Sequence, residues 1–133
     1  MKAVKSRITK GLQKDSRIEV CDNSGAKIIK ITLVIGHKGV RRRYPTCGVS
    51  DLILGSVVSG KPEMKKQVVP AVIVRQKMAY RRADGTRIVF AENAAVVLKD
   101  DKGNPKGTLI KGPIAKEVVE RWPQIGKIAS MVV

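Results

Sequence analysis

The stretch from residue 68 to residue 98, VVPAVIVRQKMAYRRADGTRIVFAENAAVVL, constrains the fold more than any other part of the sequence. Residues 68–74 form an apolar, β-branched run, which favours a strand because Val and Ile pack well on a pleated surface. Residues 75–83 are basic and contain no acid. Asp84-Gly85 then supplies turn chemistry, since glycine tolerates positive φ.

Two further strands are expected in the same stretch. Residues 86–91 (TRIVFA) predict a return strand, residues 94–98 (AAVVL) predict a third, and Glu92-Asn93 is the expected bend between them. Buried strands would therefore hold a cationic tip away from the core. Such a tip is a poor catalyst, but it is well suited to gripping phosphates.

The first half of the chain repeats this strand pattern. Residues 16–22 alternate between apolar and polar, which is typical of a half-buried strand, and a turn-rich stretch joins them to an apolar strand at 27–36. These two strands should form a hairpin. Residues 51–59 predict another long strand. The chain thus has about five main strands, and closing them into a small barrel would remove exposed edges.

The C-terminal part predicts helices. Pro113 favours the first position of a helix, and apolar residues recur on one face as far as Trp122, so an amphipathic helix of about nine residues is expected. Pro123 should stop it, and residues 124–133 favour a second short helix. We expect Trp122 to serve core packing rather than a partner contact. Residues 113–133 would then form a helical cap on the barrel.

The length of 133 residues suits a single domain, 1–133, in which residues 1–14 form a basic extension. The extension either lies on RNA or is a solvated tail. The chain has 27 Lys and Arg against 11 Asp and Glu, a formal net charge of +16. Self-repulsion at this charge weakens a compact state that stands alone, so a polyanion is the expected partner.

The sequence offers little for catalysis or metal binding. His37 is the one histidine, and neither G-x-x-x-x-G-K-[ST] nor G-x-G-x-x-G occurs. Cys21 and Cys47 are too isolated for a zinc site and are expected to be reduced thiols. We therefore expect no catalytic residue, no metal and no cofactor. No apolar run approaches the roughly 20 residues of a membrane helix, and the charged start does not have the pattern of a signal peptide.

The few aromatic residues bear on how RNA would be recognised. Proteins that bind single strands stack bases on exposed aromatic platforms, but aromatic residues make up only 3% of this chain. Of these, only Tyr44 and Tyr80 lie in basic segments, where they could stack on RNA. We therefore favour folded RNA, recognised by shape and phosphate contacts. The alternatives are a free-standing barrel that binds single-stranded nucleic acid, and a nuclease in which Asp22, Asp51 and Asp84 converge.

Several motifs carry a resemblance to a known family. The signature of the universal large-subunit ribosomal protein fourteen family resembles residues 71–74 (AVIV), followed after nine residues by Asp84-Gly85, then Phe90, Asn93 and Val96-Val97. The segment CDNSGA at 21–26 is similar to the family's first strand and turn, and GTLIKGPIAKE followed by WPQI resembles its end. The basic extension and the Trp-Pro pair are similar to its archaeal and eukaryotic branch. Ser50 departs from the pattern, because the family commonly has Gly there.

The resemblance implies a mainly β fold: a small closed five-stranded β-barrel with a projecting β-ribbon and one or two short C-terminal α-helices. It implies a structural constituent of the large ribosomal subunit, not an enzyme, that works in cytoplasmic ribosomes. The implied partners are large-subunit rRNA, small-subunit rRNA at an intersubunit bridge, neighbouring proteins including ribosomal protein three, and an anti-association factor, with no membrane. The side chains expected to contact rRNA are Lys38, Arg41, Arg42, Arg43, Lys61, Lys65, Lys66, Arg75, Lys77, Arg81 and Arg82.

Overall fold

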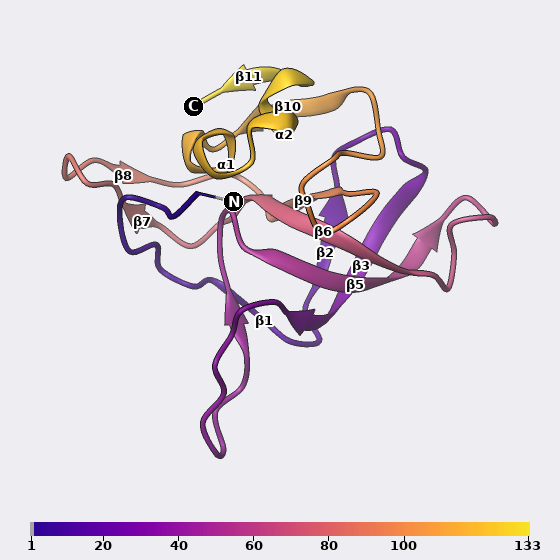
Figure 1. Ribbon diagram of the computed structural model, residues 1–133, viewed down its shortest axis with the longest axis horizontal. Coiled ribbons are helices and arrows are strands. Elements are labelled where there is room, and N and C mark those ends of the chain that lie inside the picture. Colours follow the sequence, from indigo (N-terminus) through magenta and orange to yellow (C-terminus); the bar gives the residue numbers. More distant parts are fainter. Residues whose placement is uncertain (1) are drawn as a thin grey trace.

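The computed structural model describes residues 2–133 and contains the expected closed barrel of five strands (Figure 1). The barrel strands are β2 (Arg17–Val20), β3 (Ala26–Val34), β5 (Leu52–Gly60), β6 (Val68–Arg75) and β9 (Ala94–Val97). They pair in the order β2-β3-β5-β6-β9, and β9 returns to β2 to close the barrel. All neighbours are antiparallel except β2 and β9, which are parallel.

The turn between β2 and β3 follows from its sequence. The Asp22 carboxylate accepts hydrogen bonds from the backbone N–H of Ser24 at 3.1 Å and from its hydroxyl at 2.6 Å. Its other oxygen accepts the N–H of Val97 at 2.9 Å, so the same side chain also ties the turn to β9. Asp22 is therefore used in stabilising the turn and the barrel seam, as expected of an aspartate at the end of a strand.

The apolar run of β6 is buried on both faces. Ala71 and Ile73 join the cluster that fills the barrel, together with residues such as Ile29 and Ile53. The alternate residues Val72 and Val74 belong to a second cluster, which lies between the outside of the barrel and the C-terminal segment. Successive strand residues point to opposite faces, so double burial requires a continuous apolar run instead of an alternating one.

Short strands attach the basic segments to the barrel. Strand β1 (Leu12–Gln13) pairs antiparallel with β4 (Thr46–Cys47), and β7 (Tyr80–Arg81) pairs with β8 (Arg87–Ile88) in the expected hairpin. The return strand predicted at 86–91 is thus confined to two residues, Arg87 and Ile88. In the N-terminal extension, Ile8 and Leu12 are buried, so this part of the chain packs on the body.

The C-terminal segment contains two short helices, as predicted, but their bounds differ from the prediction. Pro113 does not begin a helix, because it lies in β10 (Ile110–Ile114) and pairs with Met131. Helix α1 spans Lys116–Arg121, and Pro123 begins α2 (Pro123–Lys127) where it was expected only to stop α1. The chain ends in β11 (Ala129–Val132), parallel to β10, where helix was expected.

The two helices, β10 and β11 lie together on one side of the barrel (Figure 1). Trp122 is 3% exposed and packs in the second cluster with Ile114, Val118 and Ile125. The core role expected for Trp122 is confirmed.

Candidate nucleic-acid interface

The first basic projection is the loop between β3 and β4. Gly36 adopts φ of 83° just after β3, where an L side chain would be strained, and the N–H of Arg43 donates to the carbonyl of Val40. Pairing of β1 with β4 closes the base of the loop, helped by a hydrogen bond from the N–H of Lys14 to the carbonyl of Pro45 at 3.0 Å. The predicted contact residues of this loop are all exposed: Lys38, Arg41, Arg42 and Arg43.

The second projection, residues 61–67, connects β5 to β6. Met64 is 3% exposed and anchors the turn in the barrel cluster, while the N–H of Lys65 donates to the carbonyl of Lys61. This backbone conformation directs the predicted side chains outward, and Lys61, Lys65 and Lys66 are all exposed.

The third projection is the β7–β8 hairpin. Its turn is held by the N–H of Arg82, which donates to the carbonyl of Thr86, and by the N–H of Thr86, which donates to the Asp84 carboxylate at 2.9 Å. Hydrogen bonds from the backbone and the side chain of Thr86 lower the pKa of Asp84. Asp84 thus stabilises the turn, and Lys77 and Arg81 are exposed as expected. Sequence reasoning missed exposed Arg87, which faces Arg81 across the hairpin.

Arg75 does not belong to the exposed set. It is 5% exposed, and its Nη1 donates to the carbonyls of Lys111 and Pro113, each at 3.0 Å. Its Nη2 lies 2.6 Å from Glu92 Oε1. The guanidinium therefore joins β6 to β10, and the expectation that it contacts rRNA is withdrawn.

Arg82 and Tyr80 are also used inside the protein. Arg82 Nε donates to Glu117 Oε1 of α1 at 2.8 Å, and a second nitrogen donates to the carbonyl of Val133. Tyr80 is fully buried and donates its hydroxyl to Glu117 Oε2 at 3.0 Å, so it cannot stack on RNA as proposed from sequence. Burial and the charge of Glu117 raise the pKa of Tyr80. This triad attaches the hairpin to the C-terminal segment.

The three projections leave the barrel in different directions (Figure 1). The loop before β4 extends at the bottom of the view, the β7–β8 hairpin at the left and the β5–β6 connection at the right. The structure does bring Lys14 beside Arg42, Arg43 and exposed Tyr44, around an open depression. Lys14 was not included among the rRNA contacts expected from the sequence, although its position in the basic extension could have indicated one.

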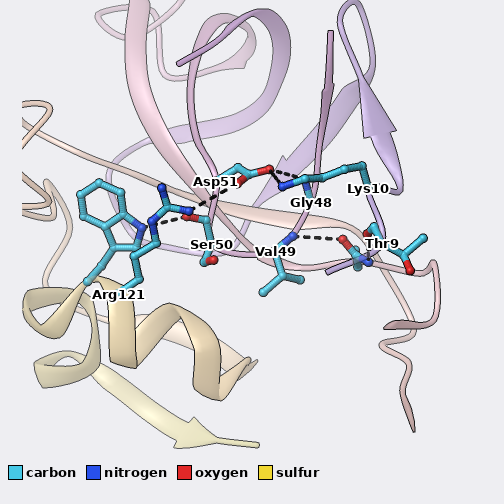
Figure 2. Close-up of polar contacts among 9 residues, drawn as sticks. Thr9, Lys10, Gly48, Val49, Ser50, Asp51 and Arg121 are labelled. Atoms are coloured by element: carbon cyan, nitrogen blue, oxygen red, sulfur yellow. Dashed lines mark hydrogen bonds and ion pairs between the residues drawn. The ribbon is translucent and has the colours of Figure 1, made fainter. Parts of the chain in front are cut away.

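A polar junction holds the extension, the loop after β4 and helix α1 together (Figure 2). Asp51 Oδ2 lies 2.6 Å from Lys10 Nζ and accepts the N–H of Gly48 at 2.8 Å, while Asp51 Oδ1 lies 3.5 Å from Arg121 Nη1. The Trp122 indole N–H donates to the carbonyl of Ser50 at 2.9 Å. This junction fixes the base of the first projection.

Buried Gln76 completes the junction. Its amide oxygen accepts the N–H of Val49 at 3.0 Å, and its amide nitrogen donates to the carbonyl of Thr9 at 2.9 Å. The chain from Thr9 to Lys10 is therefore attached to the body on both sides (Figure 2). Ser50 adopts φ of 69°, the left-handed region, which explains physically why glycine would suit this position.

Within residues 2–133, no group of three or more His, Cys, Asp or Glu side chains is placed to hold a metal ion. Asp22, Asp51 and Asp84 are each occupied in separate turns and contacts, so the convergence that a nuclease requires is not seen among them. Cys21 and Cys47 are buried free thiols, and burial raises their pKa to about 11 and about 12. None of the described helices is long and apolar enough to cross a membrane.

Comparison with known proteins gives a consistent family. A family model described as ribosomal protein L14p/L23e matches residues 11–133. The large ribosomal subunit protein uL14 of Nanoarchaeum equitans is 51% identical over 133 residues, covering 100% of both chains. The protein of the same name from Halobacterium salinarum is also 51% identical over 100% of both chains. That of Sulfurisphaera tokodaii is 52% identical over 126 residues, 95% of this chain and 91% of the relative.

Proposed function

Because the chain belongs to the ribosomal protein L14p/L23e family, we propose that it holds folded large-subunit rRNA through exposed cationic projections and helps to form an intersubunit bridge. Membership confirms the resemblance predicted from the motifs. It makes the chain a large-subunit ribosomal protein, structural and not enzymatic, which acts in the ribosome of the cytoplasm.

The observation that carries the proposal is the exposure of basic side chains on three projections of one closed scaffold. The exposed members of the predicted set are Lys38, Arg41, Arg42, Arg43, Lys61, Lys65, Lys66, Lys77 and Arg81. A closed barrel fixes the spacing of these projections, and arginine binds two phosphate oxygens at once through its planar fork. Fixed cations that point in several directions suit a protein embedded among RNA helices.

The exposure of the aromatic residues supports folded RNA over single strands. Tyr44 is 62% exposed, whereas Phe90 and Trp122 are 7% and 3% exposed and Tyr80 is fully buried. A stacking platform for successive unpaired bases needs several exposed rings. Recognition by shape and phosphate contacts requires none.

The further partners follow from the resemblance and are part of the proposal. They are small-subunit rRNA at the bridge, neighbouring proteins including ribosomal protein three, and an anti-association factor. Because the projections are separate, some of them could contact large-subunit rRNA while another contacts the small subunit. Sedimentation of the tagged protein in a cell extract tests the placement. Cosedimentation with large subunits is expected, and a protein found only at the top of the gradient would contradict it.

Replacing Arg41, Arg42 and Arg43 with alanine tests the phosphate contacts. Binding to the large-subunit rRNA should weaken, and the plot of log affinity against log salt should flatten by about 0.7–0.9 per lost contact, because fewer counterions are released. The matched control replaces three exposed lysines outside the projections, Lys99, Lys102 and Lys116, and removes the same charge. Equal slopes for the two triple variants would contradict the assignment of contacts to the loop.

A further inference from the structure

A recess lies beside the polar junction, between the N-terminal extension, the base of the first projection and helix α1. It has a volume of about 240 Å³, and its lining includes Lys10, Gly36, His37, Lys38, Asp51 and Arg121. Lys10, Asp51 and Arg121 appear together in Figure 2. The residues come from segments far apart in the chain, which is why no local motif revealed the recess.

The charges around this recess favour an anion. Asp51 is the one acid among the lining residues, and it is already paired with Lys10 at 2.6 Å and with the N–H of Gly48 at 2.8 Å. Arg121 is only 3.5 Å from the same carboxylate and makes a looser contact. Lys38 has no acid partner within 4.0 Å among residues 2–133. Lys10 neutralises Asp51, and the positive charges of Lys38 and Arg121 remain in the lining of the recess.

Two buried polar atoms in the lining residues also lack partners. His37 Nε2 and Arg121 Nε are shielded from solvent and form no hydrogen bond within the described residues. Buried polar groups are normally satisfied, because leaving one unpaired costs about 1–3 kcal/mol. Both atoms belong to residues that line the same recess, so the imidazole of His37 and the guanidinium of Arg121 keep hydrogen-bonding capacity that the protein does not use.

We propose that this recess binds a phosphate group of the rRNA backbone, held by Arg121, His37 and Lys38. The inference rests on the proposed rRNA function and adds His37 and Arg121 to the contact residues, beside Lys38 of the first projection. A tetrahedral anion with several acceptor oxygens can receive a guanidinium, an ammonium and an imidazole N–H together. The recess also joins the N-terminal extension to α1, so a bound phosphate would lie where the extension and α1 meet the first projection.

The first test uses inorganic phosphate and nuclear magnetic resonance. Phosphate is titrated into the full-length protein against chloride at constant ionic strength, and the Nε–Hε signal of Arg121 and the ring signals of His37 are followed. Both should shift and saturate, whereas the Nε–Hε signal of exposed Arg87 on the hairpin should move little. Shifts that are equal for Arg87 and Arg121 and never saturate would overturn the proposal.

The variant His37→Ala keeps the formal net charge and serves if changes at Arg121 disturb folding. It should weaken phosphate binding about three- to ten-fold, roughly the contribution of one hydrogen bond. Phosphate binding as tight as that of the parent would overturn the role of His37. Far-ultraviolet circular dichroism and Trp122 fluorescence check that the variant is folded.

The second test uses the rRNA itself. Arg121→Gln should flatten the salt dependence of rRNA binding by about 0.7–0.9, whereas Arg121→Lys, which keeps the charge, should restore the slope at lower affinity. If wild-type protein binds rRNA with a steep slope that Arg121→Gln leaves unchanged, the recess is not a phosphate site and the proposed function stands. If wild-type protein does not retain folded rRNA, the proposed function fails, and the assignment of the recess to rRNA fails with it.

Discussion

Replacing Arg75 with methionine should destabilise the fold and leave the salt dependence of rRNA binding unchanged. Arg75 was predicted from the sequence to contact rRNA, but in the structure its side chain is buried. Methionine fills a similar volume without donors, so the carbonyls of Lys111 and Pro113 would lose their shared hydrogen-bond donor. The contact between β6 and β10 would weaken.

The magnitude follows from the contacts. A hydrogen bond from a charged donor contributes about 1.5–3 kcal/mol, and Arg75 makes two to backbone carbonyls. The pair with Glu92 adds about 0–1 kcal/mol, because the Glu92 side chain is 48% exposed and well screened. Contacts that share one guanidinium are not additive, so we expect a total loss of about 3–5 kcal/mol. For a chain of 133 residues this corresponds to a fall in Tm of about 10–18 °C.

Urea unfolding followed by Trp122 fluorescence measures the loss, since this single tryptophan is 3% exposed and becomes solvated on unfolding. The matched control is Lys77→Met, two residues away and exposed. It should change the free energy of unfolding by less than about 0.5 kcal/mol, and should flatten the salt slope by about 0.7–0.9. A loss below about 1 kcal/mol for Arg75→Met would refute the structural role of Arg75, and a flattened slope would refute its exclusion from the rRNA contacts.

Two further perturbations test the hairpin turn and the buried thiols. Gly85→Val should lower the free energy of unfolding by about 1–2 kcal/mol, because φ of Gly85 is 90° and an L side chain is strained there. No neighbouring atom lies within 4 Å of a Cβ added at this position, so backbone strain is the only cost. Gly39→Val, also free of neighbours but without a left-handed φ, should be nearly neutral in the same urea assay; equal effects would reject the turn strain. Burial raises the pKa of Cys21 from 9.0 to about 11 and that of Cys47 to about 12. The thiols therefore ionise at lower pH in the unfolded chain than in the folded protein, and the free energy of unfolding should fall as pH rises above about 9. Urea unfolding between pH 8 and 10 should show a steeper decline for the parent than for the doubly Ala-substituted variant, and parallel declines would contradict the shifts.

The barrel was predictable because its strands carry local signals. The alternation before Asp22, the apolar run at 68–74 and the Asp84-Gly85 turn each specify one element without reference to the rest of the chain. Closure also followed from the number of strands and the need to cover their edges. The exposed projections were predictable because Lys and Arg side chains lie at the surface unless a specific partner inside the protein pairs with them.

The remaining differences arise from partners distant in sequence. Pro113 has good helix-start chemistry, but pairing of β10 with β11 keeps the backbone extended there. Arg75 and Arg82 look like their exposed neighbours until Glu92 and Glu117 are seen to face them. Lys10 and Arg121 meet at Asp51 from opposite ends of the chain, and no spacing rule predicts such a meeting.

The position of β9 has a consequence for biosynthesis. It is the last barrel strand in the chain, and it pairs with β6 on one side and with β2 on the other. A nascent chain that has emerged only as far as β6 can form a four-stranded sheet, but both edges of that sheet lack a partner. Residues 19–20 pair with residues 94–95, which are distant in the sequence, and contacts with a large sequence separation form slowly. Until β9 is inserted, this strongly basic precursor exposes unpaired strand edges that can pair with other chains. The risk of aggregation should therefore fall only when β9 closes the barrel.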